Sequence, residues 1–176
     1  MPAKGTAKRA AKKVSKKATK KLTKNPVRKG TLGKFVRIVG YGTFLTRRTF
    51  ERYKNVGLCK VTGFRRVHPP RSSYPFILPA SDKDGFWALV FEVPCEELPG
   101  FDAYEGVPDL YERKTISVSL KSQAVIPADI YVPSEKAVQD FKLSTINDPS
   151  DRWRELIKEK LPDLLVQYPE LAERVN

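Results

Sequence analysis

The stretch FVRIVGYGTFLT at residues 35–46 combines a strand signal, a glycine turn and a helix start. Residues 45–53 can be helical, with Thr46 as the N-cap. Gly40 and Gly42 sit between the strand and this helix, where a turn without bulky side chains exposes backbone N–H groups. The strand signal comes from β-branched and aromatic residues, namely Phe35, Val36, Ile38 and Val39. The stretch therefore predicts a buried strand followed by a loop that can hold a small anion.

Length and composition favour one globular domain at residues 31–176. The chain has 176 residues, of which 40% are hydrophobic, enough for an ordinary packed core. We find neither an apolar run long enough for a membrane span nor the apolar core of a secretory signal, so we expect a soluble, intracellular protein that is most naturally cytoplasmic.

The cysteines and the histidine limit the chemistry. Cys59, Cys95 and His68 do not form a zinc-ligand spacing or a disulfide framework. We interpret both cysteines as small core residues of a reducing compartment, and we expect no metal and no cofactor. His68 lies in the proline-rich connection RRVHPPR, so we expect a surface loop residue without a catalytic role.

The basic charge of the chain is concentrated in a Lys-rich tail at residues 1–30. This tail holds 12 of the 33 Lys and Arg residues and none of the 20 Asp and Glu residues. Lysines at positions 4, 8, 12, 16, 20 and 24 would repel one another along a helix. We therefore predict that residues 1–30 are disordered.

The function of the tail stays open between two readings. One is a solubilising segment. The other is an arm that binds nucleic acid or another polyanion without sequence preference, because clustered lysines gain free energy when they displace counterions from phosphates. The second reading leaves a nuclear location open, whereas a mitochondrial presequence is less natural because such segments favour arginine and an apolar face.

The rest of the chain predicts a mixed, mostly antiparallel sheet with flanking helices, an α+β fold. We expect strands at 56–67 with a bend near Gly63, at 86–93, at 111–120 and at 124–132, the last two paired. A short acidic helix should start at Pro94, and Ser134 should cap a helix that ends near residue 142. At the C-terminus one helical face should cover the core, interrupted at Pro162, with the apolar residues Trp153, Leu156, Ile157, Leu161, Leu164 and Leu165.

Several of these motifs in this order resemble the γ-glutamylcyclotransferase-like proteins, in particular the branch with γ-glutamylamine cyclotransferase and the avirulence-induced plant proteins. The resemblance covers residues 35–133 and rests on YGTF at 41–44, DAYEG at 102–106 and YER at 111–113, together with Tyr74-Pro75 and the strand around Trp87. Gly40, Ala88 and the Lys-rich tail depart from the family pattern. The resemblance implies a small barrel or mixed sheet as the core at 35–133, with C-terminal helices at 134–176.

The resemblance also implies a set of site residues. The substrate-binding loop would consist of Tyr41, Gly42, Thr43, Phe44 and Leu45. Glu105 would be the catalytic acid and base, and the supporting residues would be Tyr74, Tyr111 and Arg113.

The implied reaction is cyclisation of the γ-glutamyl group of a small γ-glutamyl amine or amino acid to 5-oxoproline, with release of the amine. Nucleophile and electrophile belong to one molecule, so one carboxylate can move the required protons. Burial of Glu105 against Phe101, Tyr104 and Tyr111 should raise its pKa from about 4.3 toward neutrality.

A second class of function stays open, a binding protein rather than an enzyme. In it a catalytically idle cyclotransferase-like domain serves as a scaffold that residues 1–30 anchor to a ribosome, to chromatin or to another nucleic-acid assembly. The sequence also leaves open which γ-glutamyl compound would be the substrate.

Overall fold

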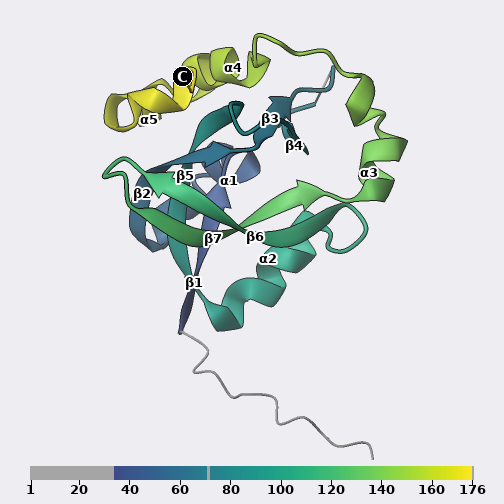
Figure 1. Cartoon of the computed structure of the whole chain (residues 1–176). Coiled ribbons are helices and arrows are strands. Elements are labelled where there is room, and N and C mark those ends of the chain that lie inside the picture. Colours follow the sequence, from purple (N-terminus) through teal and green to yellow (C-terminus); the bar gives the residue numbers. More distant parts are fainter. Residues whose placement is uncertain (1–33, 71, 176) are drawn as a thin grey trace, which may run out of the picture. The chain divides into compact units, whose positions relative to one another are not determined.

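The computed structural model describes residues 34–70 and 72–175, whose arrangement is shown in Figure 1. The predicted disordered tail at 1–30 lies outside the described residues. None of the helices in the described ranges has the length and hydropathy of a membrane-spanning segment.

Five strands close into a β-barrel in the order β1-β5-β2-β6-β7. All neighbouring pairs are antiparallel except β1 and β7, which run parallel and close the barrel. This confirms the predicted α+β class with a mostly antiparallel sheet that forms a small barrel. The strands are β1 (Phe35–Gly40), β2 (Lys54–Thr62), β5 (Gly85–Pro94), β6 (Tyr111–Leu120) and β7 (Val125–Pro133).

Alternation along the strands divides the apolar side chains into two clusters. In β5, Ala88 and Val90 belong to a cluster built mainly from barrel strands, and Leu89 and Phe91 belong to one that includes the helices. Small residues such as Cys59 suit the first cluster, because the interior of a five-stranded barrel is narrow. Both faces of β5 are thus buried, which explains its continuous apolar run.

The predicted strand at 56–67 is two strands. Gly63 has a φ of +77°, a conformation that glycine adopts readily, and it ends β2 before β3 (Phe64–Val67) begins. β3 leaves the barrel and pairs with β4 (Phe76–Pro79) in a separate two-stranded sheet. β4 was not predicted.

The predicted helix at 45–53 with Thr46 as cap is wrong. A one-turn helix α1 (Thr43–Thr46) starts two residues earlier, and a 3₁₀ turn η1 (Thr49–Arg52) follows it. Arg48 separates them with a φ of 52°. This left-handed conformation of Arg48, whose guanidinium group pairs with Glu51 and with the distant Asp163, ends the helix after one turn.

The helices that follow β5 and β7 form in the segments where the sequence predicts them. After the 3₁₀ turn η2 (Cys95–Glu97), α2 (Leu98–Glu105) ends at Gly106, whose φ is +71°. Ser134 caps α3 (Glu135–Asp140), accepting a hydrogen bond from the Ala137 amide at 3.1 Å, and the turn η3 (Leu143–Thr145) follows.

The C-terminal segment covers the core as predicted. It consists of α4 (Arg152–Lys160), α5 (Pro162–Gln167) and η4 (Pro169–Ala172), with the restart at Pro162. In Figure 1, α2 and the pair α4–α5 lie on opposite sides of the barrel. His68 corrects the sequence analysis: it is buried, not on the surface, because α4 packs near the end of β3 and Trp153 stacks on the imidazole at 6.0 Å.

Candidate functional site

A cavity of about 400 Å³ lies where the loop after β1 faces the end of α2 and the start of β6. Seven of the residues predicted for the site line it: Tyr41, Gly42, Thr43, Phe44, Tyr74, Glu105 and Tyr111. Leu45 and Arg113 are not among its lining. The Leu45 side chain is fully buried in the core that α1 covers.

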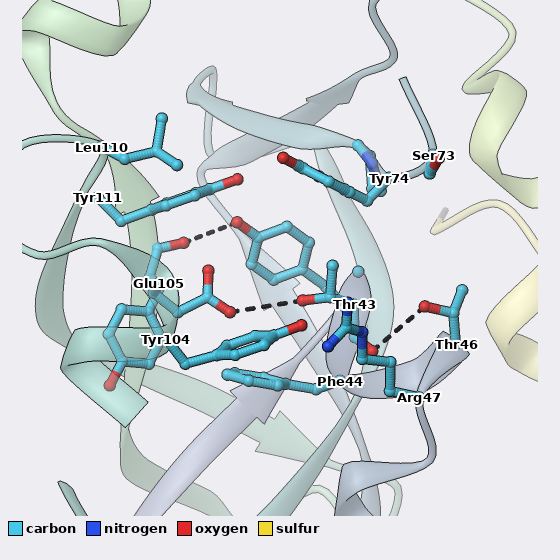
Figure 2. Close-up of a pocket in the computed structure, with 14 residues that line it drawn as sticks. Thr43, Phe44, Thr46, Arg47, Ser73, Tyr74, Tyr104, Glu105, Leu110 and Tyr111 are labelled. Atoms are coloured by element: carbon cyan, nitrogen blue, oxygen red, sulfur yellow. Dashed lines mark hydrogen bonds between the residues drawn. The ribbon is translucent and has the colours of Figure 1, made fainter. Parts of the chain in front are cut away.

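Glu105 is the last residue of α2, and its carboxyl group faces the loop (Figure 2). Oε1 accepts a long hydrogen bond of 3.4 Å from the Thr43 hydroxyl. Burial raises the pKa of Glu105 from 4.5 to about 7, although the bond from Thr43 opposes this rise. A carboxyl group with this pKa can both accept and donate a proton near neutral pH.

The two glycines of the loop have different roles. A Cβ atom on Gly40 would lie 3.1 Å from both Phe44 Cβ and Phe91 Cε1, so Gly40 lets α1 pack closely on the barrel. A Cβ atom on Gly42 would make ordinary contacts with Pro75 (3.5 Å) and Tyr74 (3.8 Å) at the cavity. Only Gly42 therefore matches the expectation of a glycine that leaves room beside a ligand.

The loop residues that line the cavity include two with first-turn backbone amides. The amide groups of Thr43 and Phe44 stand in the first turn of α1, where N–H groups have no partner within the helix. Because α1 is only one turn long, its dipole is small. The N–H groups themselves, rather than the helix dipole expected from the sequence, can bind an anion.

A charged network behind the cavity holds α2 against the barrel. Arg113 on β6 donates from Nε to Asp102 at 2.8 Å and from Nη1 to Asp129 on β7 at 2.7 Å. The Tyr131 hydroxyl also donates to Asp102 at 2.8 Å. Asp102 lies one helical turn before Glu105, so this network fixes the end of α2 and with it the catalytic candidate.

Aromatic rings form the wall around Glu105. Tyr41 donates from its hydroxyl to the Tyr131 carbonyl at 2.7 Å, and burial raises the pKa of Tyr41 well above its usual value. Burial also raises the pKa of Tyr111, and the nearby Glu105 adds to this rise. Both phenols therefore stay neutral near Glu105, and because Tyr41 already donates its hydrogen to the Tyr131 carbonyl, Tyr111 is the one of the two that can donate to a ligand.

The sequence analysis missed Arg47 as a cavity residue. Its backbone amide donates to the Thr43 carbonyl at 2.9 Å, so Arg47 lies one turn after Thr43 on the same face of α1. Its guanidinium lies 5.2 Å from the centre of the Tyr104 ring, which in turn stacks on Phe44. Figure 2 shows Arg47 pointing back toward Tyr104 beside Thr43. The spacing of four residues between Thr43 and Arg47 is visible in the sequence. The predicted helix at 45–53 did not include Thr43, so the two residues were not placed on one face.

Nothing in the described ranges suggests a metal centre. Residues 34–70 and 72–175 contain no group of three or more His, Cys, Asp and Glu side chains that could hold a metal ion.

Known structures share this fold. Two solution structures of Arabidopsis thaliana proteins are each 23% identical to the chain. The match to the first has a TM-score of 0.52 and covers 81% of this chain and 96% of the Arabidopsis chain. The match to the second has a TM-score of 0.56 and covers 77% of this chain and 82% of the Arabidopsis chain. A structure titled gamma-glutamyl cyclotransferase is 17% identical, with a TM-score of 0.52, covering 81% of this chain and 88% of its own. At these identities the likeness shows the fold alone.

A search among curated proteins gave no significant match. The family model "Gamma-glutamyl cyclotransferase, AIG2-like", in contrast, matches residues 38–155, which include both the loop after β1 and Glu105. The chain therefore belongs to the AIG2-like gamma-glutamyl cyclotransferase family.

Proposed function

We propose that this protein converts the γ-glutamyl group of a small γ-glutamyl amine or amino acid to 5-oxoproline and releases the amine. The observation that carries the proposal is the Glu105 carboxyl group, which lines the cavity opposite the loop with a pKa of about 7. Family membership supports it, because the matched range contains these residues.

In the proposed reaction the α-amine of the glutamyl group attacks the side-chain carbonyl carbon of the same group. A new carbon–nitrogen bond closes the five-membered lactam, and the bond to the departing nitrogen breaks. Glu105 takes a proton from the α-ammonium group before the attack and gives it to the departing nitrogen, and the second proton that the attacking nitrogen loses as the lactam forms leaves with the released amine, which departs as an ammonium ion. Because both reacting groups belong to one molecule, the cavity mainly has to hold the substrate bent.

The loop would hold the α-carboxylate of the substrate. The first-turn amides of Thr43 and Phe44 supply donors, and Gly42 leaves space beside them. The neutral hydroxyl groups of Tyr41 and Tyr111 lie on the same wall. An α-carboxylate held there would bring the α-amine of the substrate toward Glu105.

The charged side chains of the cavity affect which departing amine the site prefers. Arg47 and Glu105 are the charged side chains among the described residues that line it; Arg47 follows Thr43 by one turn, and the Thr43 hydroxyl donates to Glu105. Arg47 would attract a carboxylate on the leaving group and would repel a second ammonium group. We therefore expect γ-glutamyl amino acids to react faster than the matching γ-glutamyl amines.

The test is incubation of the full chain with a panel of γ-glutamyl compounds and measurement of 5-oxoproline by mass spectrometry. The panel contains γ-glutamyl alanine, its decarboxylated counterpart γ-glutamyl ethylamide, and a γ-glutamyl lysine isopeptide. We expect 5-oxoproline from at least one compound, well above the uncatalysed rate. A panel without any enzyme-dependent product would exclude the proposed activity for these compounds.

The charge distribution of the sequence favours a second candidate, the idle scaffold held at a nucleic-acid assembly. Residues 1–30 carry 12 basic residues and no acidic one. This candidate predicts salt-sensitive binding to DNA or RNA through the tail and no 5-oxoproline formation. Measuring both properties of the same preparation separates the two functions, because an enzyme with an addressing arm would show both.

A further inference from the structure

A polar cluster between β3 and α4 lacks hydrogen-bond partners. Across the described part of the chain, every buried side-chain nitrogen or oxygen atom without a partner belongs to this one cluster. The atoms are Arg66 Nη1, both ring nitrogens of His68, Asp151 Oδ1, Trp153 Nε1 and Arg154 Nε. Buried polar groups in folded proteins are nearly always satisfied, so a concentration of unsatisfied atoms in one place indicates a missing partner.

The centre of the cluster has two guanidinium groups and one carboxylate. Arg66, whose side chain is 0% exposed, donates to Asp151 from Nε at 2.9 Å and from Nη2 at 2.5 Å, and its Nη1 has no acceptor. Arg154 Nε lies 3.5 Å from the same carboxylate without the alignment of a hydrogen bond. Burial lowers the pKa of Arg66, although Asp151 opposes this effect. Arg154 is partly buried and also donates from Nη2 to the Ser150 carbonyl, but Arg66 Nη1 and Arg154 Nε are left without acceptors.

These groups open onto a second cavity, of about 460 Å³, which shares no lining residue with the cavity of Glu105. Arg66, Asp151 and Arg154 are part of its wall, where basic side chains outnumber acidic ones by five to four. Two of the acids are already engaged by their own loops: Asp84 accepts from the Ser81 amide at 3.1 Å, and Asp148 accepts from the Arg152 amide at 3.1 Å. The wall therefore has a small excess of cationic side chains, and two of its four carboxylates already accept hydrogen bonds from backbone amides.

We propose that this cavity is a second binding site, which takes a small molecule bearing a carboxylate or phosphate group that accepts hydrogen bonds from Arg66 Nη1 and Arg154 Nε. Guanidinium groups match such oxyanions in geometry and charge. Asp151 Oδ1 faces the same ligand as an acceptor for a hydroxyl or N–H group.

The site depends on a part of the chain that the family model does not include. The model matches residues 38–155, and the cavity wall also contains Glu173, Arg174 and Val175 from the end of the described chain. The ligand site therefore combines Arg66, Asp151 and Arg154 of the matched range with a C-terminal segment that lies beyond it.

The experiment measures binding to the full chain by calorimetry, with inorganic phosphate in one arm and acetate in the other. Ionic strength is held constant with chloride. We expect saturable binding of at least one probe, and the preferred arm identifies the oxyanion. Arg154→Gln removes one donor from the periphery of the cluster and should weaken binding about tenfold or more. The test uses Arg154→Gln rather than a change of Arg66, because Arg66 is fully buried and its replacement would disturb the fold.

A matched control separates the two cavities. Arg47→Gln changes the cavity of Glu105 and removes any anion binding that this cavity contributes, so we expect the binding that Arg154→Gln weakens to persist in Arg47→Gln. Loss of binding in this variant, with binding intact in Arg154→Gln, would place the anion beside Glu105 and overturn the proposal. Absence of saturable binding of either probe would mean that only water satisfies the cluster, which also overturns it.

Discussion

Replacing Glu105 by glutamine should stabilise the folded protein at alkaline pH while removing its proposed activity. The amide has the shape of the protonated acid but cannot ionise. In the native protein burial raises the pKa of Glu105 from 4.5 to about 7, so the fold favours the protonated form. The parent protein has this stability in full below pH 4.5 and loses it as the pH rises through 7, whereas the variant does not.

The size of the effect follows from the pKa shift. A rise from 4.5 to about 7 corresponds to an upper value of about 3 kcal/mol, at about 1.4 kcal/mol for each pKa unit. Glu105 is only partly buried, so solvent screening reduces the expected difference to about 2 kcal/mol. For a domain of this size we expect Glu105→Gln to melt roughly 4–8 °C above the parent at pH 8.

Thermal unfolding followed by circular dichroism at pH 4, 6 and 8 tests this prediction. Glu155→Gln, which changes an exposed carboxylate on α4, is the matched control and should show no comparable dependence on pH. At pH 4 the Glu105 variant and the parent should differ little. A Glu105 variant that is less stable than the parent at pH 8, or a difference that does not change with pH, would refute the reasoning from burial.

Three further predictions concern the cavity and the tail. Thr43→Val removes the hydrogen bond that lowers the pKa of Glu105, so the rising limb of kcat/KM against pH should move to higher pH. Thr43→Ser keeps the hydroxyl group and should restore the parent profile. An unchanged profile in Thr43→Val would contradict the role of Thr43 in setting the pKa of Glu105. Arg47→Gln should lower kcat/KM about tenfold for γ-glutamyl alanine and little for γ-glutamyl ethylamide, whereas an equal loss on both would place the contact on the glutamyl group. Deletion of residues 1–30 should leave the melting temperature and 5-oxoproline formation unchanged and abolish any binding to DNA or RNA; nucleic-acid binding that survives the deletion would contradict the role of the tail.

The barrel was predictable because its strands carry strong periodic signals. Residues 86–93 are apolar on both faces, and 111–120 alternates, so each segment indicated its own burial. Closure into a barrel depends on the parallel contact of β1 with β7, which joins Ile38 to Asp129. No local pattern encodes that contact, and it entered only through the family resemblance.

The errors arose where tertiary packing overrides local preference. The helix at 45–53 fails because Arg48 adopts a positive φ between two short turns. His68 is buried by Trp153, which lies far along the chain. β4 was missed because it has only four residues, too few for a clear strand signal, and the last of them is Pro79.

The candidate site was predicted only in part. The resemblance indicated the loop and Glu105, because these residues form contiguous motifs. Arg47 and Tyr131 were missed, since their position in the cavity depends on the true start of α1 and on the closure of β7 against the loop. The second cavity could not be foreseen either, because Arg66 and Asp151 are 85 residues apart in the sequence.

The most direct test of the proposed reaction is the identity and ratio of its products. γ-Glutamyl alanine is incubated with the parent and with Glu105→Gln, and 5-oxoproline, free alanine and free glutamate are quantified together by mass spectrometry. We predict equal amounts of 5-oxoproline and alanine from the parent, no glutamate, and a rate at least a hundredfold lower in the variant. Free glutamate in place of 5-oxoproline would show hydrolysis instead of cyclisation, and an undiminished rate in the variant would show that Glu105 is not the acid and base.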